Sequence, residues 1–192
     1  MYTTCGYKQF IDALTLAERV VGKKESLPVL SCVLLETKRG ILTIKATNLE
    51  SGIEITVPAK TEKEGVVAVP VHILTQTLKS SSEETITLSN EGGTLVVTLK
   101  KGHHTLKTIP HDEFPLIPKA SQKNGLTISK QKCIDGIASV SYAASTSTIR
   151  PEFASIFIHN STDEMFTCVA TDSFRLAEKK IQNQGNFATK RS

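Results

Sequence analysis

The sequence predicts an α+β fold built from one repeated unit, in which a strand and a helix precede three antiparallel strands. Two observations support this. The chain matches itself: Ile134 repeats Ile11 at an offset of 123 residues (134 − 11 = 123), and Thr171 repeats Thr47 at an offset of 124 (171 − 47 = 124). Hydrophobic spacing also switches between helical and strand periods in the same order in each copy. Each amphipathic helix is therefore expected to cover the apolar face of a sheet.

The first unit is predicted to begin with a strand at residues 1–6 and a helix at 7–21. Four apolar residues repeat at helical spacing and define one face: Phe10, Leu14, Ala17 and Val21. Residues 22–26 are a polar loop. Three strands with alternating polarity complete the unit, at 29–36, 41–48 and 53–59.

The second unit repeats this order, with a strand at 66–69 and a helix at 70–80. Pro70 suits a first helical turn, where its missing N–H is no loss. Three strands follow at 85–89, 94–99 and 104–109, joined by glycine-containing hairpin turns at 90–93 and 101–102. The proline-rich segment 110–118 cannot continue a strand or a helix, so it is interpreted as a linker.

The third unit is predicted to have a strand at 125–128 and a helix at 130–144, with Cys133, Ile137 and Val140 facing inward. Its three strands lie at 153–159, 165–171 and 175–181, and the polar tail 182–192 has no periodicity. Residues 1–118 then form a domain of two units, and 119–192 hold one unit without its partner.

An unpaired third unit leaves an apolar face uncovered. Three explanations stay open at this point: the chain is cut short of its natural length, the unit pairs with its twin from another chain, or it frays. Either a monomer or a pair formed through the third unit is expected in solution.

Composition sets broad limits on function. The net charge of +4 permits a polyanionic partner without requiring one. No apolar stretch reaches the length of a membrane span, and no signal peptide pattern opens the chain, so a cytoplasmic protein is expected. The four cysteines form no CxxC pair, and the repeat places them at apolar positions. Metal ions and cofactors are not expected.

Enzyme motifs are absent from the sequence. It contains no GxSxG, no HExxH and no glycine-rich phosphate loop. A Cys/His hydrolase needs a nucleophile and a base that the fold brings together. Because the repeat assigns the cysteines to the core, a non-catalytic function is favoured.

Several segments together resemble one family. They are Ser-Leu-Pro-Val-Leu at 26–30, Ala-Thr-Asn-Leu-Glu at 46–50, Thr-Ile-Pro at 108–110 with Asp-Glu-Phe-Pro at 112–115, and Val-Ala-Thr-Asp-Ser-Phe-Arg-Leu-Ala at 169–177. In this order and spacing the chain resembles, over its whole length, the bacterial DNA polymerase III beta subunits, which are sliding clamps.

The resemblance implies a DNA-clamp fold, with helices on the inner face and antiparallel sheets outside. It implies a processivity factor for DNA replication: two full-length chains would form a ring around duplex DNA. The implied partners are the DNA polymerase III alpha subunit, the clamp loader and other proteins with a clamp-binding motif. By this comparison the chain holds the first domain and half of the second, without the third. The alternative is a stand-alone protein-binding module of the same fold that does not encircle DNA.

The resemblance also implies three sites. A ring that slides needs diffuse positive charge facing DNA, and the candidate residues are Lys23, Lys24, His72, Lys79 and Arg150. A hydrophobic groove for partner peptides is implied at Phe153, Thr171, Ser173, Phe174, Arg175 and Leu176. Ring closure is implied at the edge strand 98–106, which contains Lys100, with candidate residues Lys101, His103, His104 and Leu106.

Each site has an ordinary structural alternative. A single lysine is as well explained as a solvated surface charge, and Phe174 and Leu176 as core residues of a sheet. The cations at 98–106 are equally explained as protection of an edge strand against unwanted pairing. Some family members have Gly-His where this chain has Ser173-Phe174, so the bulkier aromatic would reshape the groove.

Overall fold

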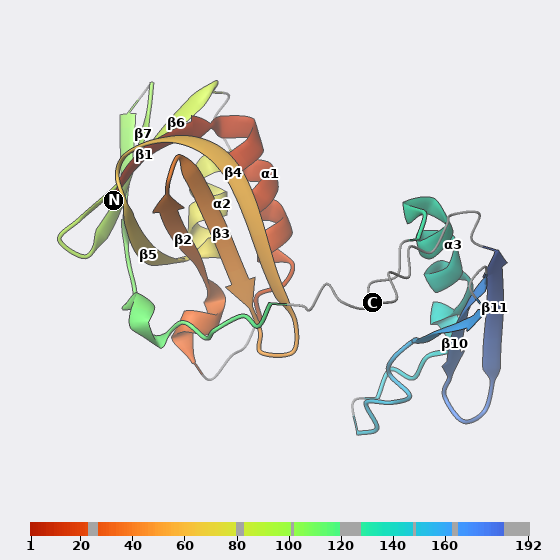
Figure 1. Ribbon diagram of the computed structural model, residues 1–192. Helices are drawn as coiled ribbons and strands as arrows, with labels where there is room; N and C mark the ends of the chain where they lie inside the picture. The colour runs from red at the N-terminus through yellow and green to blue at the C-terminus, as the bar shows by residue number, and fades with distance from the viewer. Residues whose placement is uncertain are drawn as a thin grey trace, which may run out of the picture. The chain divides into compact units, whose positions relative to one another are not determined.

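The computed structural model describes residues 1–22, 27–79, 83–100, 102–119, 128–147, 149–162 and 165–182. The chain divides into two compact units, Met1–Pro118 and Lys119–Ser192 (Figure 1). Within the described ranges, no helix is long and apolar enough to cross a membrane.

Unit 1 contains two copies of the repeat, each with a strand, a helix and three further strands. In the first copy these are β1 (Tyr2–Gly6), α1 (Tyr7–Glu18), a 3-10 turn η1 (Pro28–Ser31), β2 (Cys32–Lys38), β3 (Ile41–Thr47) and β4 (Gly52–Lys63). In the second they are β5 (Gly65–Pro70), α2 (Val71–Lys79), β6 (Thr85–Glu91), β7 (Thr94–Leu99) and β8 (Gly102–Lys107), and the 3-10 turn η2 (His111–Glu113) follows.

The two copies interlock in one antiparallel sheet of order β5-β2-β3-β4-β1-β6-β7-β8. The first strand of each copy pairs with the other copy, β1 with β6 and β5 with β2. One bridge between Ala68 and Ile109 brings the two ends of the sheet together, because the Ile109 N–H donates to the Ala68 carbonyl at 2.9 Å. Each copy therefore contributes its first strand to the part of the sheet that the other copy forms.

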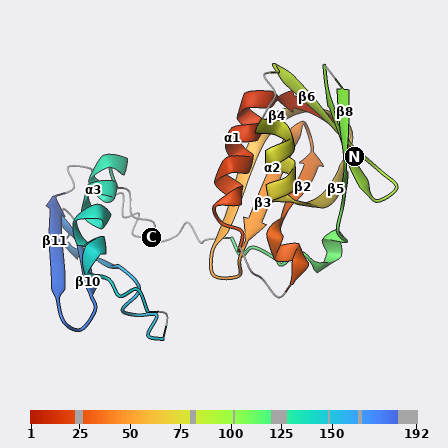
Figure 2. The ribbon, with the colours of Figure 1, turned by 180° about the vertical axis from the view of Figure 1, so that it is seen from behind.

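The core of unit 1 lies between this sheet and the two helices. Figures 1 and 2 show α1 and α2 side by side on one face of the sheet. Phe10 and Leu14 of α1, and Leu74 and Leu78 of α2, are fully buried there. Alternation along β3 places Leu42, Ile44 and Ala46 in the same core, as the sequence pattern predicts.

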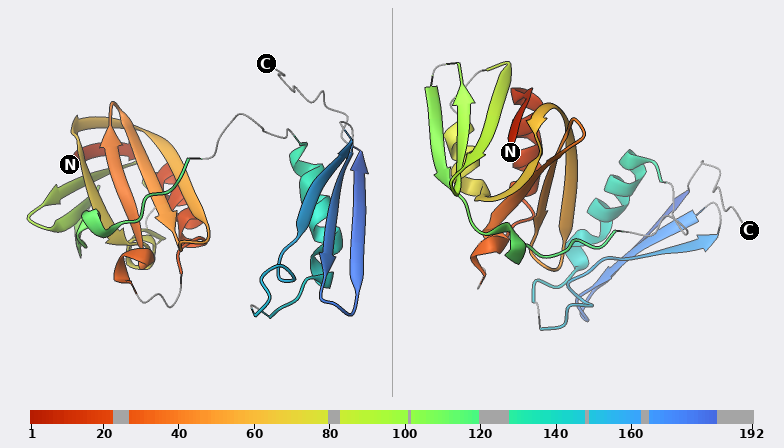
Figure 3. Two further views of the ribbon diagram at one scale, coloured as in Figure 1. Left: turned by 60° about the horizontal axis from the view of Figure 1, so that its bottom comes forward. Right: turned by 60° about the vertical axis from the view of Figure 1, so that its left-hand side comes forward.

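Unit 2 holds one copy of the repeat. Helix α3 (Lys130–Val140) and the 3-10 turn η4 (Ser141–Ala143) pack on a sheet of order β11-β10-β9, formed by β9 (Phe157–Thr162), β10 (Met165–Thr171) and β11 (Leu176–Gln182) (Figure 3). The core is correspondingly small and consists of Val140, Ala143, Phe166, Cys168, Ala170, Ala177 and Ile181.

Residues at equivalent positions show what the single copy lacks. Leu14 is 0% exposed, whereas Ile137, 123 positions later (137 − 14 = 123), is 37% exposed. Leu35 of β2 is 0% exposed, whereas Ile158 of β9 (158 − 35 = 123) is 41% exposed. The expectation that Ile137 faces fully inward is therefore wrong, because no second helix flanks α3 among the described residues of unit 2.

Several element boundaries differ from the sequence prediction. The strand expected from residue 29 begins at Cys32, because Pro28 starts a 3-10 turn in which the Ser31 hydroxyl donates to the Pro28 carbonyl at 2.7 Å. The strand expected from residue 153 begins at Phe157, because residues 150–154 turn, with the Phe153 N–H donating to the Arg150 carbonyl at 3.0 Å.

The helix bounds also differ from the prediction. α1 stops at Glu18, and α3 gives way to 3-10 geometry at Ser141. Pro70 was expected in the first turn of the second helix, but it ends β5, and α2 begins at Val71. The strand expected at 125–128 and the tail after residue 182 fall almost wholly outside the described residues. The expected linker at 110–118 belongs to unit 1, where Ile117 packs so close to Gly52 that a Cβ there would lie 2.8 Å from it.

Candidate functional site

Two candidate DNA-contacting residues of unit 1, His72 and Lys79, lie on α2 and share one acidic neighbour on α1. The imidazole Nδ1 of His72 lies 3.1 Å from Oε1 of Glu18, and Nζ of Lys79 lies 3.9 Å from Oε2 of the same carboxylate. Both side chains are exposed, at 70% and 59%. Glu18 therefore offsets part of the positive charge on this helix surface.

Sequence reasoning missed Glu18 because Glu18 and His72, which are in contact, are 54 positions apart in the chain. Lys23 and Lys24 are outside the described residues. Arg150 belongs to unit 2, where its guanidinium carbon lies 5.6 Å from the ring centre of Phe153, a cation–π distance.

Five of the six candidate peptide-binding residues, Thr171, Ser173, Phe174, Arg175 and Leu176, belong to a tight turn between β10 and β11. Oδ1 of Asp172 accepts hydrogen bonds from the N–H groups of Phe174 at 3.0 Å and Arg175 at 2.9 Å. The Thr171 hydroxyl donates to the Arg175 carbonyl at 2.7 Å. These bonds hold Ser173 at φ +77°, a left-handed conformation that is uncommon outside glycine.

Unit 1 contains the same turn between β3 and β4. Oδ1 of Asn48 accepts from the N–H groups of Glu50 at 3.1 Å and Ser51 at 2.7 Å. Leu49 has φ +74°, which matches the φ of Ser173. The bonding pattern confirms the repeat at the offset of 124 residues that the sequence predicts.

The turn in unit 2 presents a group of exposed side chains. Phe174 is 98% exposed and Leu176 is 67% exposed, so the alternative that they are core residues of this unit is wrong. The Arg175 guanidinium bonds Oδ2 of Asp172 at 2.9 Å and lies 5.8 Å from the ring centre of Tyr142. Phe153 is half-buried in the turn after residue 150. A large exposed aromatic beside an oriented arginine suits recognition of another chain.

Acid is expected to loosen the turn of unit 2 and not the turn of unit 1. Hydrogen bonds from the N–H groups of Arg175 and Phe174, with the Arg175 guanidinium, lower the pKa of Asp172 below its ordinary value of 3.8. A carboxyl whose pKa is lower in the folded chain stabilises it above the unfolded pKa, and this contribution disappears as pH falls through the folded pKa. Asn48 does not titrate.

Hydrogen exchange of residues 171–176 at falling pH tests this expectation, after correction for intrinsic exchange rates. Protection of this segment should fall below about pH 4, while protection at 47–52 should not. The matched variant Asp172→Asn keeps an acceptor at Oδ1. In this variant, protection of residues 171–176 should no longer fall in acid. An acid response that survives in Asp172→Asn would contradict the assignment to this carboxylate.

Three of the four candidate interface residues, His103, His104 and Leu106, lie on β8, an edge strand of the unit 1 sheet. His103 and His104 are exposed, and Lys101 is outside the described residues. Leu106 is only 6% exposed because it pairs with Leu95 in the core-facing register of the hairpin. The side chain of Leu106 therefore contributes to the core of unit 1.

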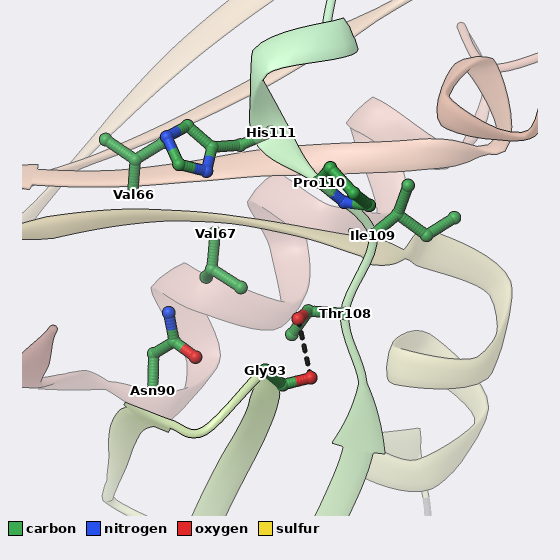
Figure 4. Close-up of a pocket in the computed structure, with 8 residues that line it drawn as sticks. All are labelled: Val66, Val67, Asn90, Gly93, Thr108, Ile109, Pro110 and His111. Atoms are coloured by element: carbon green, nitrogen blue, oxygen red, sulfur yellow. Dashed lines mark hydrogen bonds between the residues drawn. The ribbon is translucent and has the colours of Figure 1, made fainter.

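A cavity of about 300 Å³ lies where the two ends of the sheet meet (Figure 4). It is lined by Val66, Val67, Asn90, Gly93, Thr108, Ile109, Pro110 and His111. The Thr108 hydroxyl donates to the Gly93 carbonyl at 2.7 Å. Oδ1 of Asn90 is buried and has no hydrogen-bond partner among the described residues, so it is free to accept one donor. No sequence signal marked this seam.

The cysteines do not form a reactive site. Cys5, Cys32 and Cys168 are buried and Cys133 is half-buried, all as free thiols. Burial raises the pKa of Cys5 to about 12, so its thiol stays protonated at neutral pH. In the described part of the chain, no three His, Cys, Asp or Glu side chains gather closely enough to hold a metal ion.

Comparisons with known proteins all match one family. Residues 1–118 match the family described as DNA polymerase III beta subunit, N-terminal domain. A beta sliding clamp from Micrococcus luteus is 28% identical over 171 residues, which cover 89% of this chain and 54% of the relative. The chain thus spans about half the length of such relatives.

Solved structures give the same result. The DNA polymerase III beta subunit of Pseudomonas aeruginosa is 27% identical, with a TM-score of 0.88 over 96% of this chain and 50% of that one. The beta subunit from the DNA polymerase of Streptococcus pyogenes is 26% identical, with a TM-score of 0.86 over 98% of this chain and 52% of that one. Both similarities extend beyond residue 118 and so include unit 2.

Proposed function

The chain belongs to the DNA polymerase III beta subunit family, and on this premise we propose that it supplies the first domain and half of the second domain of a DNA sliding clamp. The observation that carries the proposal is the family match to residues 1–118, a unit whose two helices lie together on one face of a single sheet. The protein is a non-catalytic processivity factor that encircles duplex DNA in the bacterial cytoplasm and tethers the replicative polymerase.

The proposed roles of the surfaces follow from electrostatics and exposure. A ring holds DNA by topology, so its inner face needs only weak, sequence-independent attraction to phosphates. Lys79 on α2, with Lys23 and Lys24 after α1, supplies that charge, and His72 on α2 adds a hydrogen-bond donor for phosphates. Partner proteins, including the polymerase III alpha subunit and the clamp loader, dock on the exposed turn at Phe174. The β8 edge closes a homodimeric ring when the family's remaining domains are present.

Retention on circular DNA tests the proposed function. The complete polypeptide that carries this sequence, loaded on a nicked circular plasmid, should stay bound during gel filtration and dissociate after the plasmid is linearised. A protein that stays on linear DNA with free ends binds by contacts, and one that never stays on the circle is the stand-alone binding module. Either result would contradict the proposal that the protein forms a ring around DNA.

Glu18→Gln is expected to strengthen binding of duplex DNA at low salt. Removing the carboxylate frees His72 and Lys79 for phosphates, so affinity should rise several-fold, and each added phosphate contact should steepen the salt dependence by about 0.9. Fluorescence anisotropy of a labelled duplex over a salt series measures both. The control Glu50→Gln makes the same charge change at the β3–β4 turn. Equal gains in the two variants would mean that only net charge matters.

A further inference from the structure

The cavity where the two ends of the unit 1 sheet meet, here called the seam cavity, has the size of a small-molecule site. Its volume of about 300 Å³ lies at the lower end of the range of roughly 300–1,000 Å³ that such sites have. It is lined by residues 66, 67, 90, 93 and 108–111, which all belong to unit 1 (Figure 4). The cavity is thus a property of the folded first unit alone.

Hydrogen bonds hold the walls of the seam cavity in place. The Gly93 carbonyl accepts from both the N–H and the hydroxyl of Thr108, at 3.2 Å and 2.7 Å. Next to this contact, the Ile109 N–H donates to the Ala68 carbonyl at 2.9 Å, and β5 itself is paired with β2 along its length. Because the walls are fixed in advance, a ligand that enters has little conformational entropy to remove.

The lining is mainly apolar and has no side chain with a permanent charge. His111 is the only titratable residue among those that line the cavity. A charged ligand would lose its hydration there without meeting an opposite charge, which is costly. An uncharged ligand is therefore expected. Aliphatic surface for its body comes from Val66, Val67, Ile109 and Pro110.

One polar atom of the lining lacks a partner. Oδ1 of Asn90 is buried, and no described residue donates a hydrogen bond to it. A buried acceptor without a donor carries a free-energy cost, which a ligand with a donor can relieve. The terminal torsion of an asparagine side chain is soft, so the amide can turn its oxygen toward the cavity. The Gly93 carbonyl already accepts two hydrogen bonds, so the ligand's donor is directed to Asn90.

We propose that the seam cavity binds a small uncharged molecule with an apolar body and one N–H or O–H donor. The donor bonds Oδ1 of Asn90, and the body packs on the aliphatic side chains of β5 and of the segment after β8. This site is separate from the surfaces to which DNA and peptide binding are assigned above. The inference therefore does not rest on the proposed function, and retention on circular DNA does not decide it.

Indole and indene test the proposal as a matched pair, because the two molecules have nearly the same shape and only indole has an N–H donor. Each is titrated into the isotope-labelled chain and followed by NMR. The amide signals of Val67, Thr108 and Ile109 should shift with saturation. Indole should bind about 3- to 10-fold more tightly than indene, as expected for one hydrogen bond to a neutral acceptor.

Two variants locate the site. Asn90→Leu removes the acceptor with little change in volume, so indole should bind no more tightly than indene. Val66→Phe fills the cavity and should abolish the signal shifts from both molecules. The control Thr98→Val makes a polar-to-apolar change at an exposed position of β7 outside the lining, and it should keep the preference for indole.

Thermal unfolding of each variant checks that unit 1 remains folded. Equal affinities of the parent chain for indole and indene would overturn the proposal, because the acceptor would then play no part. A preference for indole that survives in Asn90→Leu, or signal shifts that survive in Val66→Phe, would also overturn it, because the molecules would then bind elsewhere.

Discussion

Leu14→Ala is expected to lower the free energy of unfolding of unit 1 by about 2–5 kcal/mol. Leu14 lies on α1 and is fully buried in the core of unit 1. Its truncation should leave a cavity, because the paired strands around it cannot move enough to close the space. Ile137→Ala removes a similar side chain at the equivalent position of unit 2. It should cost less, about 1.5 kcal/mol, because Ile137 is already 37% exposed.

Urea denaturation followed by hydrogen exchange and mass spectrometry resolves the two units, which is necessary because the chain has no tryptophan. Leu16→Ala is the control within α1, since Leu16 is 47% exposed and should cost little. Equal losses from Leu14→Ala and Ile137→Ala would mean that the helix of unit 2 is covered as completely as α1. The description of unit 2 as half of a domain would then be wrong.

Phe174→Ala is expected to raise the Kd for a clamp-binding-motif peptide of the polymerase alpha subunit by about tenfold or more. The expectation rests on the proposed function. Phe174 is 98% exposed, so its removal should not change the stability of either unit. Isothermal titration calorimetry measures the Kd, and thermal unfolding provides the check on folding.

The turn of unit 1 offers a matched control for this prediction. Glu50 occupies the position that Phe174 occupies in unit 2 (174 − 50 = 124), and the two turns share their hydrogen bonds. Glu50→Ala should leave the peptide Kd unchanged. An unchanged Kd in Phe174→Ala would remove this residue from the peptide site, and a lower melting temperature would make its role structural.

The sequence predicted those parts of the fold that depend on local spacing and on the repeat. Alternation placed Leu42 and Ile44 in the core, and the offset of 124 residues placed Thr47 and Thr171 in equivalent turns. Two strand starts were wrong, because Pro28 and Pro151 begin local turns inside segments that are apolar enough to look like strands. The spacing of hydrophobic residues alone does not reveal such turns.

The candidate site was less predictable because its features depend on contacts between distant residues. Glu18 meets His72 only because α1 and α2 lie side by side, and Leu106 is buried only because its strand pairs with β7. The cavity at Asn90 exists only where the ends of the sheet meet. The exposure of Phe174 follows from the turn at Ser173, whose left-handed conformation no residue type in the segment signals.

Site-specific photo-crosslinking to DNA tests the central claim most directly, namely that the helices face the duplex and the sheet faces away. A photo-crosslinker is placed at His72, on the exposed surface of α2, or at Glu54 of β4, which pairs with Lys45 on the sheet face opposite the helices. In the complete polypeptide loaded on circular DNA, the probe at position 72 should crosslink and the probe at 54 should not. Crosslinking from 54 alone would contradict the account.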